Sequence, residues 1–284
     1  MSKKIVLTGT AVPRVVEFTA DATAAGKTLG ALRMRYHLDE LGVANTLVAI
    51  ESRGVESYKT MRPGDVFIPT EDFSRAAELP GGLAGVLKPL YVAIELAAKA
   101  GSVIIIDWAG GHTQNRLEAF AATGFDQRLA ELNMSGLSVI VTTSASDRMR
   151  QAAENLRRTA EIVPLMRRAL LLNERQGSFA FQPGTAAAAA HADLLRAAEG
   201  ASLLRFAAIR GESWQECEAA GLTLPAVKRA TPSHVASKTR LDTFSAAACI
   251  SEVAAWWLLT ARALAPVFPF PGAAGASTVK EPAA

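Results

Sequence analysis

The chain is poor in the residues that build disulfide and metal sites. Its 284 residues include two cysteines and four histidines, and none stands at the spacing of a metal-binding cluster. The patterns G-x-S-x-G and H-E-x-x-H do not occur either, which argues against the serine hydrolases and zinc proteases that use them. We expect Cys217 and Cys249 to be small buried hydrophobic residues in a reducing, cytoplasmic compartment.

A surplus of one charge is also missing. Thirty basic and 27 acidic residues give a net charge of +3, so composition alone does not indicate a nucleic-acid-binding protein. Arginine is concentrated between residues 148 and 175. Such a cluster either binds DNA or an acidic partner or forms a solvated helix face, and the sequence leaves both open. Half the residues are hydrophobic and a fifth are charged, which is typical of a globular protein.

Long uncharged apolar runs are absent as well. The first residues lack the extended apolar stretch of a secretory signal. The most apolar helical segment, residues 246–265, contains Glu252 and Arg262, so we predict a packed C-terminal helix and no membrane span. Trp256 and Trp257 leave a membrane-surface role as an alternative.

Short apolar segments, in contrast, recur along the chain and alternate with helical patterns. Because the apolar segments are continuous, they predict a mostly parallel sheet covered on both faces, a three-layer doubly wound α/β fold. We expect one domain over residues 1–265, ending in a helix at about 239–265, and a flexible tail at 266–284. The expected strands lie at 15–18, 45–50, 66–68, 102–107, 138–142, 168–172 and 203–207.

The stretch of residues 15–30, VVEFTADATAAGKTLG, carries the strongest motif. A strand pattern leads into small residues and then Gly26-Lys27-Thr28, where a helical pattern begins; this is the context of a P-loop NTPase. Backbone N–H groups at a helix start attract anions. We predict that Lys27 reaches the outer phosphates of ATP and that the Thr28 hydroxyl binds Mg²⁺. The other predicted nucleotide contacts are Asp21, Ala24, Ala25, Gly26 and Leu29.

The motif departs from G-x-x-x-x-G-K-[ST] at its first position, where Asp21 stands in place of glycine. A carboxylate beside a triphosphate is unfavourable unless it points away or meets a cation. The turn itself is accessible, because aspartate adopts left-handed backbone angles more readily than most residues. A strand and helix with a chance GKT and no ligand is the alternative interpretation.

Polar and glycine residues follow other predicted strands, at the edge where a nucleotide would lie. Asp107 ends the segment VIIID and is expected to hold Mg²⁺ opposite the P-loop hydroxyl. Gly110 and Gly111 would let backbone N–H groups approach the terminal phosphate. Glu51 would hold the metal through water or activate the attacking water, unless it is a solvated carboxylate. Asn173 either contacts an adenine edge or is a turn residue.

GKT, VIIID-x-x-GG and LLLNER occur in an order that resembles the ParA/MinD group of P-loop ATPases over roughly residues 14–230. The resemblance implies that Lys27, Thr28 and Asp107 are the P-loop lysine, its threonine and the acidic strand end. It also implies slow ATP hydrolysis, a homodimer of ATP-bound subunits, and a DNA, partition or conjugation partner. The family's loop reads K-G-G-x-G-K-[ST], and its first lysine crosses the dimer; Ala22 occupies that position here.

Three functions therefore stay open. The first is an ATP-binding, weakly hydrolysing switch that acts in plasmid or chromosome partition, conjugation or protein positioning. The second is an ATP-dependent metabolic ligase or kinase similar to dethiobiotin synthetase, whose loop T-D-T-x-x-G-K-T also lacks the first glycine. The third is a binding module that has lost hydrolysis, which Asp21 and Ala22 suggest.

Overall fold

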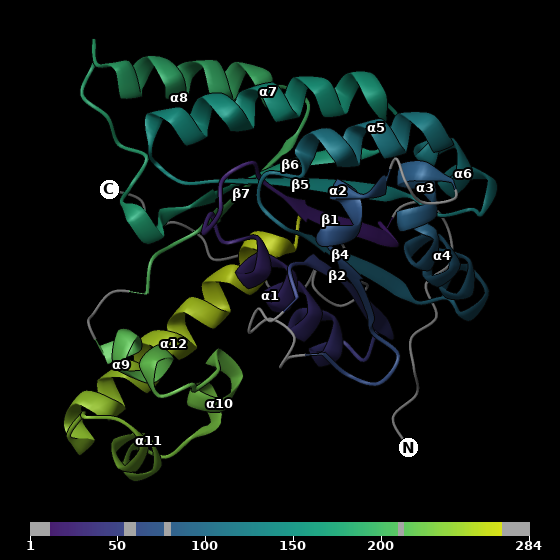
Figure 1. The fold of residues 1–284 in the computed structure, drawn as a ribbon. Helices are drawn as coiled ribbons and strands as arrows, with labels where there is room; N and C mark the ends of the chain where they lie inside the picture. The colour runs from purple at the N-terminus through teal and green to yellow at the C-terminus, as the bar shows by residue number, and fades with distance from the viewer. Residues whose placement is uncertain (1–11, 54–60, 77–80, 210–212, 269–284) are drawn as a thin grey trace, which may run out of the picture.

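A seven-stranded, all-parallel sheet forms the centre of the molecule (Figure 1). The computed structural model describes residues 12–53, 61–76, 81–209 and 213–268. Within these residues the strand order is β3-β2-β4-β1-β5-β6-β7, so the predicted three-layer α/β fold is confirmed. The strands are β1 Val15–Thr19, β2 Asn45–Glu51, β3 Val66–Pro69, β4 Val103–Trp108, β5 Gly136–Thr142, β6 Arg167–Asn173 and β7 Ser202–Phe206.

Helices cover both faces of the sheet (Figure 1). On one face α1 and α12 pack against a core that includes Val16 and Phe18 of β1. On the other face α4 and α5 pack on Val15 of β1, and α7 and α8 pack on β5 and β6. The helices are α1 Lys27–Glu40, α2 Glu71–Ser74, α3 Gly82–Val86, α4 Lys88–Ala100, α5 Thr113–Thr123, α6 Phe125–Glu131, α7 Ser146–Ile162, α8 Ala186–Ala197, α9 Ser213–Ala219, α10 Leu224–Arg229, α11 Pro232–Lys238 and α12 Thr243–Leu264.

A buried ionic cluster joins β1 to α5 and α7. Glu17 of β1 forms an ion pair with Arg116 of α5 and accepts a hydrogen bond from Trp108 Nε1 at 2.9 Å. The Arg116 guanidinium also donates to Asn155 Oδ1 and Thr159 Oγ1 of α7, both at 2.8 Å. A buried charge is tolerated only when paired and hydrogen-bonded. The cluster therefore fixes α5 against the strand that leads into the predicted P-loop.

Helix boundaries differ from the sequence prediction where proline or a capping residue intervenes. Helix α3 ends before Pro89, which lies in the first turn of α4, where its missing N–H is tolerated. Helix α12 begins at Thr243 because Asp242 accepts hydrogen bonds from the backbone N–H groups of residues 244 and 245. Helix α10 begins after Thr223, whose side chain accepts the backbone N–H of Ala226, and Pro225 sits in its first turn.

The C-terminal helix α12 packs on the body of the protein. By length and a mean hydropathy of 1.4, it passes the test for a helix able to cross a membrane. Its Trp256 and Trp257 are nevertheless buried, and the Arg33 guanidinium of α1 lies 4.2 Å from the Trp257 ring centroid. Val267 and Phe268, predicted to belong to the tail, are buried in the core. Residues 269–284 lie outside the described part of the chain.

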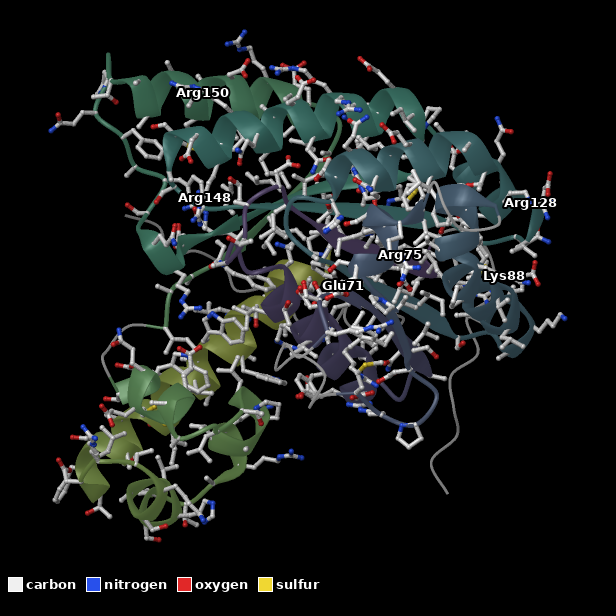
Figure 2. The ribbon with its side chains drawn as sticks, viewed as in Figure 1. Glu71, Arg75, Lys88, Arg128, Arg148 and Arg150 are labelled. Atoms are coloured by element: carbon white, nitrogen blue, oxygen red, sulfur yellow. The ribbon has the colours of Figure 1, made fainter. Side chains whose placement is uncertain are left out.

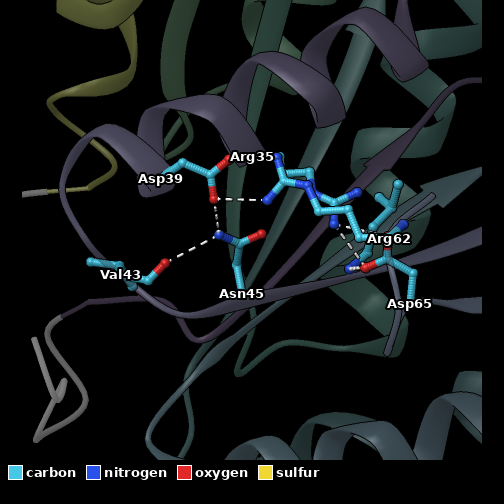
Figure 3. Close-up of polar contacts among 7 residues, drawn as sticks. Arg35, Asp39, Val43, Asn45, Arg62 and Asp65 are labelled. Carbon is cyan, nitrogen blue, oxygen red and sulfur yellow. Dashed lines mark hydrogen bonds and ion pairs between the residues drawn. The ribbon is translucent and has the colours of Figure 1, made fainter. Parts of the chain in front are cut away.

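Two ion pairs, Arg35–Asp65 and Arg62–Asp39, join α1 to the segment before β3, at the edge of the sheet (Figure 3). The Arg35 guanidinium lies 2.8 Å from Asp65 Oδ2, and both side chains are 2% exposed. Asp65 Oδ1 also accepts the backbone N–H of Leu47 in β2 at 3.0 Å. The second pair, Arg62 with Asp39, is 2.6 Å long but partly exposed. Breaking the buried pair should therefore cost more stability than breaking the exposed one.

We expect Asp65→Asn to lower the free energy of unfolding by about 3–5 kcal/mol, since it removes the negative charge that the Arg35 guanidinium contacts in a buried environment. The control Asp39→Asn removes the exposed pair and should lower it by less than about 1 kcal/mol. Urea denaturation of the two variants measures both values. Equal losses would show that the buried pair has no special weight.

Candidate functional site

The carboxyl ends of parallel strands meet at one edge of the sheet, and most of the predicted site residues gather there. Residues 20–26 connect β1 to α1 at this edge. Asp107 of β4 is paired in register with Phe18 of β1 on one side and with Ala49 of β2 on the other. The end of the VIIID segment thus lies beside the loop that opens α1.

Lys27, the first residue of α1, is buried at the centre of this edge. Only 7% of Lys27 is exposed, and its ammonium donates to the Ala22 carbonyl oxygen at 2.9 Å. Burial lowers the pKa of the ammonium, while the charges of Asp107, Glu51 and Asp21 oppose this. A buried ammonium that donates to a loop carbonyl oxygen can exchange that contact for the phosphates of an incoming anion.

Asp107 is the matching buried acid. Burial raises its pKa to about 7, against the effect of a hydrogen bond from Thr28 and of the Lys27 charge. Its Oδ1 has no hydrogen-bond partner among the described residues. A buried carboxylate oxygen without a partner is unfavourable unless a cation joins it.

The donor set of this edge fits Mg²⁺. The Thr28 hydroxyl and the Asp107 carboxylate are hard oxygen donors in mutual contact. Mg²⁺ in phosphate-transfer sites takes one or two protein ligands and completes its shell with water and phosphate oxygens. No group of three His, Cys, Asp or Glu side chains that could hold a metal occurs in the part of the chain that the structure describes.

The loop backbone is held by contacts from β4 and β6. Asn173, at the end of β6, donates through Nδ2 to the Ala25 carbonyl oxygen at 2.9 Å. Gly26 has φ of +101°, and a Cβ placed there would lie 2.2 Å from that same amide nitrogen. On the other side, the Gly111 N–H donates to the Asp21 carbonyl oxygen at 2.8 Å. The loop therefore closes onto both neighbouring segments.

Ala24 of the P-loop and Gly110 of the loop after β4 lie where the two loops pack closely. Ala24 has φ of +55°, a left-handed angle at a position where the resembled family has glycine, and it is strained there. A Cβ on Gly110 would lie 2.9 Å from the Thr23 methyl group. The glycine pair after β4 thus allows its loop to lie directly on the P-loop.

Glu51 lies at the end of β2, on the far side of Asp107. Its Oε1 accepts the backbone N–H of Ser52 at 3.0 Å. Its charge raises the pKa of Lys27, Asp107 and His112 together, which places it in the same electrostatic environment. The structure thus brings Glu51 to the site.

A pocket of about 200 Å³ opens beside the loop, lined by Leu29 and Asn173 together with Arg175, Trp214 and Trp256. The first two were predicted as nucleotide contacts; the two tryptophans were not. Trp256 reaches the pocket because its indole N–H donates to the Ala207 carbonyl oxygen just beyond β7, at 2.8 Å. No local pattern in the sequence could reveal that contact, which spans 49 residues.

Arg148 is a further residue at this edge that the sequence analysis placed in a general arginine cluster. It lies in the first turn of α7, after β5, and its charge lowers the pKa of Lys27. Figure 2 shows it toward the loop side of the molecule, whereas Arg150 of the same helix points outward. Its short distance in sequence from a strand end is the signal that could have identified it.

The fold of this chain is similar to that of several solved structures, whereas its sequence has no close match. No protein-family model matches the chain, and no curated protein matches it. Among solved structures, it is similar to a ParA family ATPase from Chlorobium tepidum TLS, with 16% identity and a TM-score of 0.48 over 88% of this chain and 99% of the other. It is also similar to an ATP complex of McdA from Cyanothece, with 13% identity and a TM-score of 0.49 over 76% and 90%.

A third similar structure is cobyrinic acid a,c-diamide synthase from Mycobacterium smegmatis with an ATP analogue and magnesium. The identity is 16% and the TM-score 0.43, over 68% of this chain and 84% of the other. At these values, the chemistry of the site has to come from the residues of this chain.

We expect Gly26→Ala to destabilise the protein more than Gly64→Ala does. Both glycines have strongly positive φ, +101° and +93°, but a Cβ at Gly64 would meet nothing within 4 Å. Backbone strain alone should lower the free energy of unfolding by about 1–3 kcal/mol in each variant. The additional loss at Gly26, measured by urea denaturation, reports the contact with Asn173; equal losses would contradict the packing described above.

The raised pKa of Asp107 predicts a pH dependence. Because its folded-state pKa of about 7 exceeds the ordinary 3.8, the folded protein holds this proton more tightly than the unfolded chain. The contribution of Asp107 to stability therefore falls as pH rises from about 4 to about 7. Asp107→Asn should gain about 2–3 kcal/mol relative to the unmodified protein between pH 5 and pH 8 in nucleotide-free urea titrations. A difference that does not change with pH would contradict this.

Proposed function

We propose that this chain binds Mg²⁺–ATP at the edge formed by residues 20–28 and Asp107. The observation that carries the proposal is a buried ammonium and a buried carboxylate on adjoining segments, the carboxylate with one oxygen left without a partner. Such a pair matches a ligand that brings both negative charge and a cation. A polyphosphate with its divalent ion has that chemistry.

Binding begins with the exchange of internal contacts. The Lys27 ammonium leaves the Ala22 carbonyl oxygen for a phosphate oxygen, a stronger charge-assisted bond. Thr28 and Asp107 would hold Mg²⁺, and the ion would supply charge neutralisation at the phosphates. Glu51 would orient the attacking water.

The loop after β4 supports a switch. The Gly111 N–H donates to the Asp21 carbonyl oxygen. This hydrogen bond must break before the same N–H can contact a terminal phosphate. Opening would move the start of α5 relative to the P-loop, and glycine at φ of +80° accommodates the change. We therefore propose that the bound phosphate sets the conformation of this loop.

The base is proposed to lie in the pocket beside Leu29, between Asn173 and the tryptophans. Both ends of the Asn173 amide already have partners, because Oδ1 accepts the Arg175 N–H at 3.2 Å and Nδ2 donates to the P-loop. Stacking on Trp214 or Trp256 is then the main source of affinity for a base.

Slow hydrolysis and a regulatory role complete the proposal. Ala22 supplies no second cation to the phosphates, and charge neutralisation is the main contribution to phosphoryl transfer. A cytoplasmic homodimer acting with DNA or with a partition or conjugation protein is the biological role that the ParA/MinD resemblance implies. That role stays a prediction, because it depends on a partner that the site does not identify.

We expect Lys27→Ala to weaken Mg²⁺–ATP binding at least about 100-fold, since it removes the buried cation from the phosphates. Isothermal titration calorimetry with ATP and ADP measures the effect. The control Lys88→Ala removes an exposed lysine at the start of α4, far from the loop in Figure 2, and should bind like the unmodified protein. Absence of binding by the unmodified protein would reject the proposal.

A further inference from the structure

The site has too little positive charge for the ligand proposed above. Three carboxylates, Asp21, Glu51 and Asp107, act on Lys27, and Ala22 stands where the resembled family places a second lysine. A triphosphate adds more negative charge to this edge. Phosphoryl-transfer sites balance that charge with cations positioned in advance. A second cation beside the loop would balance this charge.

Arg148 is the cation that the fold brings there. It stands in the first turn of α7, after the carboxyl end of β5, the strand next to β1. Its Nη1 donates only to neutral oxygens, Gln176 Oε1 at 3.1 Å and Thr143 Oγ1 at 3.4 Å. Among the described residues no carboxylate lies within ion-pair distance of it, although Arg157 of the same helix pairs with Asp193.

The position of Arg148 on its helix is itself unfavourable for a cation. The N-terminus of a helix carries partial positive charge, so a basic side chain in the first turn is repelled. Arg148 is nevertheless half-buried there. An anion placed between Arg148 and Lys27 would relieve both this repulsion and the repulsion between the two side chains.

We propose that Arg148 is a second cationic contact for the outer phosphates of the bound nucleotide, supplied by the same chain that holds the P-loop. The inference rests on the proposed function, because it assigns a further residue to that site. Guanidinium binds two phosphate oxygens at once, and charge-assisted bonds to phosphate are stronger than those to the neutral oxygens of Gln176 and Thr143. Bound nucleotide would therefore draw Arg148 from these partners.

A cation from the same chain has a consequence for kinetics. An arginine supplied within one chain stabilises the transition state without a partner subunit. ATP turnover per chain should then be independent of protein concentration. A cation supplied across a dimer would instead make turnover rise with concentration until the dimer is saturated.

The test compares Arg148→Ala and Arg148→Lys with the matched control Arg150→Ala, an exposed arginine of the same helix. Thermal unfolding first establishes that all three are folded. Calorimetry with Mg²⁺–ATP, Mg²⁺–ADP and AMP, and phosphate release at several protein concentrations, are the readouts. Arg148→Ala should lose about 10- to 100-fold in ATP affinity and little in AMP affinity. Arg148→Lys should recover part of the loss, and Arg150→Ala should match the unmodified protein.

The outcomes separate this inference from the function it rests on. If the unmodified protein binds ATP and Arg148→Ala binds it equally well, the inference is overturned while the proposed function stands. If Arg148→Ala and Arg150→Ala lose affinity equally, a general effect of surface charge replaces the specific contact, and the inference is again overturned. If the unmodified protein binds no nucleotide, both fail.

Discussion

The proposed nucleotide site depends on one electrostatic constraint, the burial of Lys27 and Asp107 at the carboxyl edge of the sheet. Each group is removed from water, and burial lowers the pKa of Lys27 and raises the pKa of Asp107 although each charge favours the other. The pair is incomplete as a structural ion pair, because Lys27 donates to a loop carbonyl and one Asp107 oxygen has no partner in the described chain. If these two residues served stability alone, we would expect every polar atom of both side chains to have a hydrogen-bond partner within the protein.

The rest of the fold holds this edge in place. Register along β1, β4 and β2 sets Asp107 beside the loop, and the buried Glu17–Arg116 pair fixes α5 behind it. Asn173 ties the loop to β6. Helix α1, which begins with Lys27, is in turn anchored to α12 by Arg33, whose guanidinium donates to Thr260 Oγ1 at 2.8 Å. Static contacts thus connect the loop region to α5, β6 and the C-terminal helix.

The sequence predicted what local patterns encode. Continuous apolar runs identified the strands of the sheet, and Gly26-Lys27-Thr28 after the first of them located the loop, because strand, turn and helix signals coincide there. Contacts between distant segments were not predictable: neither the Asn173 bond to the loop nor the pocket position of Trp256 has a periodic signature. Helices α10 and α11 have no clear helical periodicity in the sequence, because both are short and start at Thr-x-Pro or Thr-Pro.

The most direct test is a crystal structure of the protein with Mn²⁺ in place of Mg²⁺ and a non-hydrolysable ATP analogue, with anomalous scattering used to locate the metal. The account predicts one manganese peak between the Thr28 hydroxyl and the Asp107 carboxylate, with the outer phosphates against the Lys27 ammonium. A nucleotide bound elsewhere, or a metal that does not contact Asp107, would contradict it.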